Sequence, residues 1–262
     1  MVNNMTQKER REFLIKYLID ENRTFAELSV PQSESEQITL LRALMNVRSP
    51  MVIGKDFLDV QDEYLKERAK EKGIVRLENL SEIKDNIYLW QGDITRLQVS
   101  AIVNAANSGM TGCYRQNHNC IDNCIHTFSG VQLRLKCSEI MEAQGYDEPT
   151  GTAKITPAYN LPSDYVIHTV GPIVQGRPNN TQCAELKSCY NSCLKLASEY
   201  NLESIAFCCI STGVFGFPKK EAAEIAVSTV KEYQKNHNIK VIFNVFGNED
   251  LEIYNNLLSK GE

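Results

Sequence analysis

The alternation of strand-like and helical segments after residue 86 restricts the fold more than any other feature of this sequence. Short runs rich in β-branched and other apolar residues occur at 87–90, 101–105, 153–158, 165–170, 204–210 and 241–246. Helical periodicity covers 121–144, 183–200, 219–236 and 250–260. Such alternation is typical of domains in which helices cover both faces of a sheet. We therefore predict a three-layer α/β/α domain with a mixed central sheet over residues 86–262, with ligands at the strand ends.

Residues 1–85 have a different pattern and predict a small helical extension. Amphipathic helices are expected at 6–22 and about 56–72, the second ending at Gly73. Another helix is expected to begin at Ser33, because Ser33 and Glu36 have the spacing of a capping box. We favour a packing extension that covers one edge of the main domain over a dedicated substrate-recognition module. Nothing in this range suggests catalysis.

Composition and charge exclude several classes of protein. With 262 residues and 42% hydrophobic residues, the chain can bury a substantial core. The net charge of -5 and pI near 5.6 argue against a broad nucleic-acid-binding surface, including that of an RNA-binding module. No apolar run reaches the roughly 18 residues of a membrane span, and the polar start is unlike a signal peptide. We expect a cytoplasmic monomer that binds neither nucleic acid nor membranes.

Nine scattered cysteines do not predict a disulfide framework in a chain of this size, and most should be buried. The exception is Cys113-x4-His118-x-Cys120, in a loop with Gly109 and Gly112 directly before a predicted helix. Thiolate and imidazole together suit Zn²⁺, and three protein ligands leave one position for water or substrate. The sequence therefore predicts a catalytic zinc site, with a chance grouping of these residues as the alternative.

The cysteine-histidine cluster is followed by two residues that bear on its interpretation, Asp122 and Cys124. Cys124 could complete a closed structural metal site, but its helical spacing favours packing in the core with Ile121 and Ile125. Asp122 falls in the first turn of the predicted helix, where backbone amides and the helix dipole favour a carboxylate. That capping role alone accounts for an aspartate. The functional alternative places Asp122 beside the metal, where it orients a water or a sugar hydroxyl.

The segment 211–218 is a second candidate site, between a predicted strand and a helix that begins near Lys219. Glycines in such a loop allow backbone amides to turn toward a phosphate, and the helix start adds a favourable dipole. The segment has neither the P-loop lysine nor a GxGxxG pattern, so an ordinary turn is the alternative. The rings of Phe215, Phe217 and Phe246 can stack on a base or pack in the core.

Five motifs in this order resemble the macrodomain family, which binds ADP-ribose: GDIT (92–95), VNAAN (103–107), CIDNCIH (120–126) followed by Ser-Gly, HTVGP (168–172) and STGVFGFP (211–218). The resemblance covers about residues 86–262. Common macrodomain hydrolases have a glycine-rich loop before the catalytic helix, whereas this chain has GCYRQNHNCIDN (112–123). That difference resembles the zinc-dependent subclass found in microbes, which also carries an N-terminal helical extension.

The resemblance implies roles for individual residues. Asp93 corresponds to the residue that accepts a hydrogen bond from the adenine amino group, and Ile94 adds a backbone contact. Asn107 corresponds to the residue that binds the distal ribose. It shares the catalytic site with Asp122, which corresponds to the catalytic aspartate. Asn104 corresponds to a structural residue. The diphosphate-binding loop comprises Ser211, Thr212, Gly213, Val214, Phe215, Gly216 and Phe217.

Two further substrate-binding residues follow from the resemblance. Phe246 is a neighbour of the adenine. Asn123 replaces a glycine that many relatives have after the aspartate, so the distal ribose is expected to be held differently.

The resemblance implies a zinc-dependent hydrolase that releases ADP-ribose from mono-ADP-ribosylated proteins, with an acidic side-chain linkage favoured. Its cofactor would be Zn²⁺, and its partners would be the modified protein and the ADP-ribose product. Two alternatives remain. One is a non-catalytic ADP-ribose-binding module, and the other is an O-acetyl-ADP-ribose deacetylase.

Overall fold

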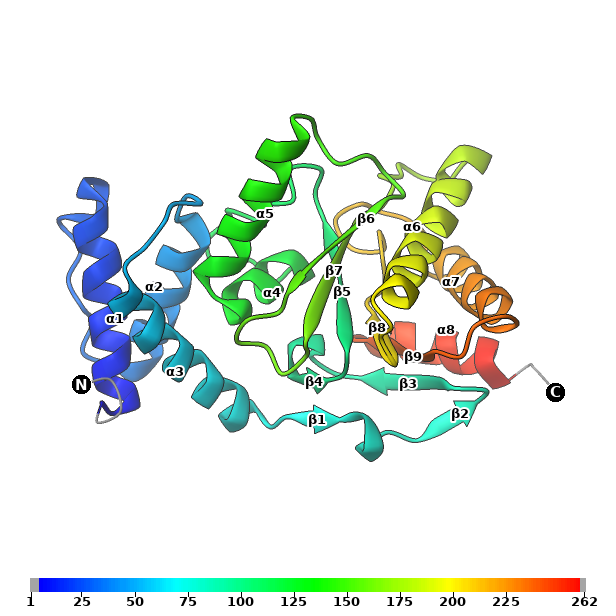
Figure 1. The fold of residues 1–262 in the computed structure, drawn as a ribbon, viewed down its shortest axis with the longest axis horizontal. Helices are drawn as coiled ribbons and strands as arrows, with labels where there is room; N and C mark the ends of the chain where they lie inside the picture. Colours follow the sequence, from blue (N-terminus) through cyan, green and yellow to red (C-terminus); the bar gives the residue numbers. More distant parts are fainter. Residues whose placement is uncertain (1–4, 260–262) are drawn as a thin grey trace.

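The computed structural model describes residues 5–259 and has a seven-stranded sheet at its centre (Figure 1). Its strands are β2 (Glu82–Lys84), β3 (Ile87–Gln91), β5 (Ala101–Ala106), β6 (Ala153–Pro157), β7 (Tyr165–Val170), β8 (Ser204–Phe207) and β9 (Lys240–Val245). They lie in the order β2-β3-β9-β8-β5-β7-β6. The edge strands β2 and β6 are antiparallel to their neighbours, and the five inner strands are parallel. Two short strands, β1 (Val75–Arg76) and β4 (Leu97–Gln98), form a separate parallel pair.

One face of the sheet is covered by α4 (Ile121–Ser129) and α5 (Val131–Gln144). Asn104 of β5 and His168 of β7 are register partners, so their side chains lie together on this face. Asn104 reaches Asp122 of α4, and His168 lies 3.9 Å from the Cys137 thiol of α5. The buried polar residues Asn104, Asp122 and His168 therefore lie together where α4 packs on the sheet.

The opposite face is covered by α6 (Asn180–Glu199), α7 (Lys219–Gln234) and α8 (Asn248–Ser259). Phe207 and Phe243 are register partners on this face. Their rings pack on Tyr190 of α6 and Tyr254 of α8, with centroids 4.9 and 5.0 Å apart. The prediction of a three-layer α/β/α domain with a mixed sheet is confirmed.

The predicted single helix at 121–144 is wrong, because α4 and α5 are separate helices that meet at Gly130. Gly130 has a φ of 100°, which only glycine adopts readily. A Cβ atom there would also lie 2.6 to 3.0 Å from the side chains of Gln132, Gln61 and Asn160. Other ranges shift by a few residues, and the predicted last helix includes Lys260, which lies outside the described residues.

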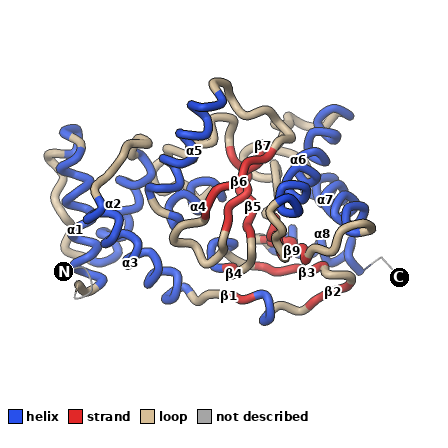
Figure 2. The backbone as a smooth tube through the Cα atoms, viewed as in Figure 1, coloured by secondary structure: helices blue, strands red, loops and turns tan. Residues whose placement is uncertain are grey.

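The N-terminal segment forms α1 (Gln7–Glu21), α2 (Glu34–Val47) and α3 (Lys55–Lys72), close to the predicted ranges. The Ser33 hydroxyl accepts a hydrogen bond from the Glu36 amide before α2, and Gly73, with a φ of 83°, ends α3. These helices lie beside α4 and α5 (Figure 2). They share a hydrophobic core of their own, which also includes Val131 of α5. β2, at residues 82–84, lies before the predicted domain boundary at residue 86.

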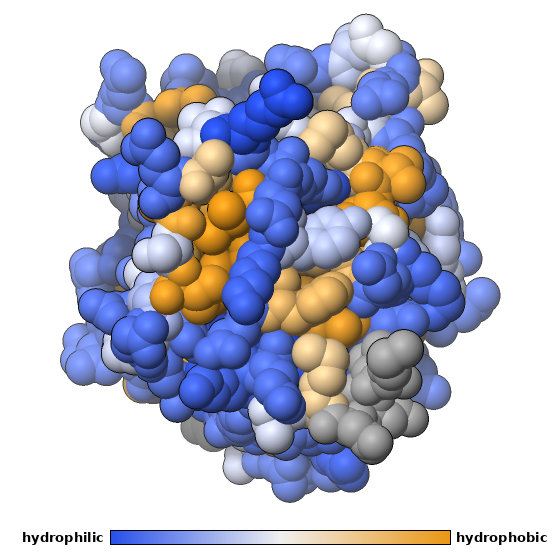
Figure 3. Space-filling model, turned by 90° about the vertical axis from the view of Figure 1, so that its left-hand side faces the viewer, coloured by the Kyte–Doolittle hydropathy of each residue, from blue (hydrophilic) through white to orange (hydrophobic). Residues whose placement is uncertain are grey.

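The surface of the N-terminal region combines polar and apolar side chains. Figure 3 shows this side of the molecule, where apolar patches lie between polar residues. Leu28, Met51 and Val52 are among its exposed large apolar residues. Among the described residues, we find no helix with the length and apolar character that a bilayer crossing requires.

Candidate functional site

The predicted site residues follow the carboxyl ends of four adjacent parallel strands. Asp93 follows β3, Phe246 follows β9, segment 211–217 follows β8, and Asn107 follows β5. Since neighbouring strands are about 4.8 Å apart, the strands that hold Asp93 and Asn107 are roughly 14 Å apart. The sheet therefore arranges these residues in one row, in the order that the resemblance assigns to adenine, diphosphate and distal ribose.

Asp93 lies at one end of this row, as the N-cap of a short 3₁₀ turn at Ile94–Arg96. One carboxylate oxygen accepts from the Thr95 amide and hydroxyl at 3.0 and 2.6 Å, and the other accepts from Lys72 at 2.6 Å. Burial raises the pKa of Asp93, but the hydrogen bonds from Lys72 and Thr95 outweigh burial and hold this pKa below its usual range. Ile94 beside it is buried.

Lys72 is a site neighbour that the sequence did not suggest. It ends α3, and its ammonium also lies 3.5 Å from the centroid of the Phe128 ring of α4. This contact places the N-terminal helices beside the residue predicted to bind adenine. A lysine in the last turn of a helix is common, because it complements the helix dipole, so the sequence carries no sign of this role.

Asp122 lies at the other end of the row, in the first turn of α4, and is only 5% exposed. The Asn104 amide donates to one carboxylate oxygen at 2.8 Å, and the Asn107 amide donates to the other at 3.2 Å. Burial raises the pKa of Asp122 to about 6, although both amides act to lower it. The two asparagines of VNAAN thus fix the carboxylate, and only Asn107 is part of the predicted substrate row.

A buried histidine pair lies behind Asp122. His126 Nε2 is 3.5 Å from the carboxylate, and burial lowers the pKa of His126 well below its usual value. The imidazole is therefore neutral, and this contact is not an ion pair. His168 contacts Asn104 at 3.1 Å and Thr156 at 2.9 Å, and burial lowers its pKa to about 3. His126 is thus a packed residue of α4.

His126, Cys137 and His168 also lie close enough together to hold a metal, with ligand atoms within 4.8 Å of one another. Sequence spacing did not suggest this group, because its members come from three different elements. Both ring nitrogens of His168 already have polar neighbours, and burial raises the pKa of Cys137 to about 12. We therefore interpret these three residues as part of the packed interior behind Asp122 and not as metal ligands.

The neutral histidines predict a loss of stability in acid. Both have depressed pKa values when folded, so below about pH 6.5 the unfolded chain binds more protons than the folded chain. The free energy of unfolding should therefore fall as the pH drops from 6.5 toward 4.5, by up to about 1.4 kcal/mol per pH unit for each histidine. Urea denaturation across this range measures the slope.

His168→Gln should reduce this slope, whereas His237→Gln, at an exposed histidine, should not change it. An identical slope in the wild type and the His168→Gln variant would refute the assignment of a buried neutral His168.

The predicted zinc ligands do converge. Cys113, His118 and Cys120 are half-buried, and their ligand atoms lie within 4.8 Å of one another. Cys113 Sγ is 3.6 Å from His118 Nδ1. Burial raises the pKa of the Cys120 thiol to about 12, so this thiol must release its proton when it binds a cation. Two thiols and one imidazole on a short loop fit the ligand preferences of zinc.

Cys124 is not part of this cluster. The prediction that it packs in the core with Ile121 and Ile125 is wrong, because Cys124 is half-buried and lies 3.6 Å from the guanidinium of Arg42 on α2. The helical periodicity of the sequence predicted that Cys124 faces the core. The sequence could not show that α2 supplies a polar neighbour there.

Asn123, predicted to bind substrate, is fully buried. Its amide nitrogen donates to the Cys113 and Arg115 carbonyls at 3.3 and 2.9 Å, and its oxygen accepts from Arg42 at 2.9 Å. The side chain therefore holds the loop that carries the zinc ligands.

The loop at 211–217 makes a tight turn at the end of β8. Ser211 and Gly216 have φ values of 65° and 70°, and the Phe217 amide donates to the Ser211 carbonyl at 3.0 Å. Val214 is exposed, whereas the ring of Phe217 is in the core and cannot stack on a ligand. Phe246 is 80% exposed, so it presents a free aromatic surface next to this loop.

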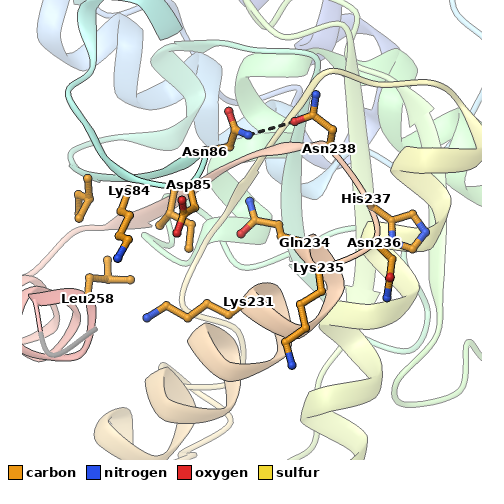
Figure 4. Close-up of a pocket in the computed structure, with 12 residues that line it drawn as sticks. Lys84, Asp85, Asn86, Lys231, Gln234, Lys235, Asn236, His237, Asn238 and Leu258 are labelled. Atoms are coloured by element: carbon orange, nitrogen blue, oxygen red, sulfur yellow. Dashed lines mark hydrogen bonds between the residues drawn. The ribbon is translucent and has the colours of Figure 1, made fainter. Parts of the chain in front are cut away.

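A cavity of about 740 Å³ lies at the opposite edge of the sheet, where β3 begins and α7 ends (Figure 4). Its lining includes Lys231, Lys235 and His237, and Asn86 donates to Asn238 beside it at 3.0 Å. None of the predicted site residues lines it. The carbonyl end of α7 also disfavours anions there, so we distinguish this cavity from the candidate site.

Comparisons with known proteins agree with this geometry. The family described as Macro domain matches residues 103–226. A protein-ADP-ribose hydrolase from Treponema medium is 56% identical, over 97% of this chain and 100% of that protein. A protein of the same name from Staphylococcus aureus (strain MSSA476) is 49% identical over 95% of each chain.

Solved structures show the same fold. The Oceanobacillus iheyensis macrodomain with MES bound has 38% identity and a TM-score of 0.62, over 69% of this chain and 94% of that one. The Trypanosoma brucei macrodomain in complex with ADP-ribose has 27% identity and a TM-score of 0.64, over 87% of this chain and 97% of that one. Near-complete coverage of relatives that are about half identical, together with this fold, places the chain in the macrodomain family.

Proposed function

We propose that the protein is a zinc-dependent hydrolase that removes mono-ADP-ribose from modified proteins, with an acidic side-chain linkage favoured. The observation that carries this proposal is the meeting of Cys113, His118 and Cys120 directly before α4, whose first turn holds the buried Asp122. The row of strand ends from Asp93 to Asn107 supplies a surface of suitable order for ADP-ribose. The relatives named protein-ADP-ribose hydrolases support the activity.

Each group in the row has a distinct part in the proposed reaction. Asp93 accepts a hydrogen bond from the adenine amino group, and the backbone of 211–217 binds the diphosphate. Asn107 holds the distal ribose close to Asp122. Asp122 then aligns a water molecule and takes its proton as the water attacks C1″ of the ribose. The bond from C1″ to the protein carboxyl oxygen breaks, which yields ADP-ribose and the free acidic side chain.

A zinc ion held by Cys113, His118 and Cys120 would supply Lewis acidity, which lowers the pKa of a bound water or ribose hydroxyl. Asn104 contributes by keeping the Asp122 carboxylate in place. We further propose that the enzyme is a cytoplasmic monomer. Its nine free cysteines fit a reducing compartment.

The decisive experiment measures zinc content and the release of ADP-ribose from a protein modified on glutamate or aspartate. Both are measured before and after the metal is stripped, and again after zinc is restored. We expect about one zinc per chain, and turnover that is lost and then recovered. Binding of ADP-ribose without any release would indicate a reader module. Faster turnover of O-acetyl-ADP-ribose than of the modified protein would indicate a deacetylase.

Asp93→Ala should weaken ADP-ribose binding by about 10- to 100-fold, because a hydrogen bond to a charged group contributes about 1.5–3 kcal/mol. Calorimetry with ADP-ribose measures the loss. The hypoxanthine analogue of ADP-ribose lacks the amino group, so its affinity should differ little between the wild type and Asp93→Ala. Equal weakening of both ligands would show that Asp93 does not recognise the amino group.

A further inference from the structure

We infer that Arg42 of α2 is a positioning residue for the metal loop, which we define as residues 111–120. The inference rests on the proposed zinc function, since this loop carries all three proposed ligands. It assigns a role to the N-terminal helices, which the sequence favoured as a packing extension.

The metal loop contains neither helix nor strand. Gly112 and Asn117 have φ values of 86° and 52°, so the backbone turns sharply directly before Cys113 and again directly before His118. Within the loop, the His118 amide donates to the Arg115 carbonyl at 3.3 Å, and side chains from other elements bind further backbone groups of the loop. The positions of the three ligands therefore depend on these external contacts.

Arg42 makes the most direct of these contacts. Its guanidinium donates to the carbonyl oxygen of His118 at 2.7 Å and to Asn123 Oδ1 at 2.9 Å. It also lies 3.4 Å from the side-chain oxygen of Asn119. Because Asn123 in turn holds the Cys113 carbonyl, Arg42 connects to the backbone of two ligands. The guanidinium spreads its donors over a planar fork, with which Arg42 reaches all three of these oxygens.

A second group of contacts connects α2 to the loop directly at Asn117, and through Arg134 at Thr111. Asn46 Oδ1 accepts from the Asn117 amide, and Asn46 Nδ2 donates to Thr127 of α4, each at 2.9 Å. Arg134 of α5 donates to the Thr111 carbonyl at 2.8 Å and to the Asn46 carbonyl at 2.7 Å. The loop is thus held between α2, α4 and α5, and α2 contributes both Arg42 and Asn46.

Loss of Arg42 should loosen the loop without removing any ligand. Groups that orient the ligands of a metal commonly change metal affinity by about 10- to 100-fold when they are replaced. We expect Arg42→Met to weaken zinc binding by this factor, and to lower turnover at limiting zinc. Affinity for ADP-ribose should change less than about threefold, because Asp93 and segment 211–217, which are predicted to bind it, lie outside these contacts.

The test compares Arg42→Met with Arg11→Met, a matched control. Arg11 is equally part of the N-terminal helices and is 3% exposed, but it pairs with Gln37 and Glu34 inside them. Zinc affinity is measured by competition with a chelating dye. Hydrogen exchange of residues 111–120 is measured in zinc-free protein, so that this readout does not depend on the metal. Arg42→Lys keeps the charge but replaces the planar fork of the guanidinium with a single nitrogen, and should have intermediate zinc affinity and exchange.

Weaker zinc binding and faster loop exchange in Arg42→Met, but not in Arg11→Met, would support the inference. Wild-type zinc affinity and exchange in Arg42→Met would overturn it, as would equal changes in Arg11→Met. If Arg42→Met does not fold, the same comparison is made with Arg42→Lys. If the wild-type protein binds no zinc, the proposed function fails, and loop exchange alone decides the role of Arg42.

Discussion

Cys113→Ala and Cys120→Ala should each abolish release of ADP-ribose from a modified protein and keep most of the affinity for free ADP-ribose. Each variant leaves two of the three ligands that converge before α4, which is too few to hold zinc well. A metal that acts as a Lewis acid supplies several kcal/mol of transition-state stabilisation, so single-turnover rates should fall by at least about 1,000-fold. Rate, zinc content and ADP-ribose affinity are measured on the same preparations.

Cys183→Ala is the matched control, because Cys183 is another half-buried cysteine but lies in α6, on the opposite face of the sheet. It should retain the wild-type rate and zinc content. A metal-free Cys113→Ala enzyme with full turnover would exclude the proposed role of zinc. A large loss of ADP-ribose affinity in both variants would show instead that the loop takes part in binding ADP-ribose.

The position of the site residues at strand ends could be predicted from local patterns, whereas their individual roles came from the resemblance to the macrodomain family. The apolar runs marked the strands, and parallel strands place their carboxyl ends at one edge of the sheet. The cluster of Cys113, His118 and Cys120 was visible for a similar reason, since its members are close in sequence. Neither prediction required knowledge of how distant elements pack.

The contacts from the N-terminal helices could not be predicted in this way. Lys72 meets Asp93 across 21 positions, and Arg42 meets His118 across 76. Both are ordinary charged residues on amphipathic helices, and only the docking of α2 and α3 gives them partners. The pairing of Asn104 with His168 likewise depends on strand order, which the sequence leaves open.

The break between α4 and α5 is a different case, because a local sign was present. Gly130 interrupts a periodic pattern, and glycine inside such a pattern lowers the helix propensity by about 1 kcal/mol. The apolar periodicity on both sides favoured one continuous helix. In the structure Gly130 has a φ of 100°, and the side chains of Gln61 and Asn160 lie where a Cβ atom at this position would be, so only glycine fits at the break.

Asp122→Asn should lower turnover by about 100- to 10,000-fold, the usual contribution of a positioned acid or base. The change is nearly isosteric but removes the charge, and the new amide would face the donors of Asn104 and Asn107, which now both point at the carboxylate. Zinc content should stay the same, because Asp122 is not among the converging ligands. Single-turnover rates and zinc content are the measurements.

Two comparisons separate catalysis from helix capping for Asp122. The exposed carboxylate of Asp164 provides the control, and Asp164→Asn should leave the rate unchanged. If Asp122 only stabilised the start of α4, Asp122→Asn would lower the free energy of unfolding and leave the rate of folded enzyme intact. A fall in kcat with the ADP-ribose Kd nearly unchanged instead indicates an interaction made in the transition state. That result would place the proton transfer at Asp122, a carboxylate that the fold buries, orients with two amides, and sets directly after the proposed metal ligands.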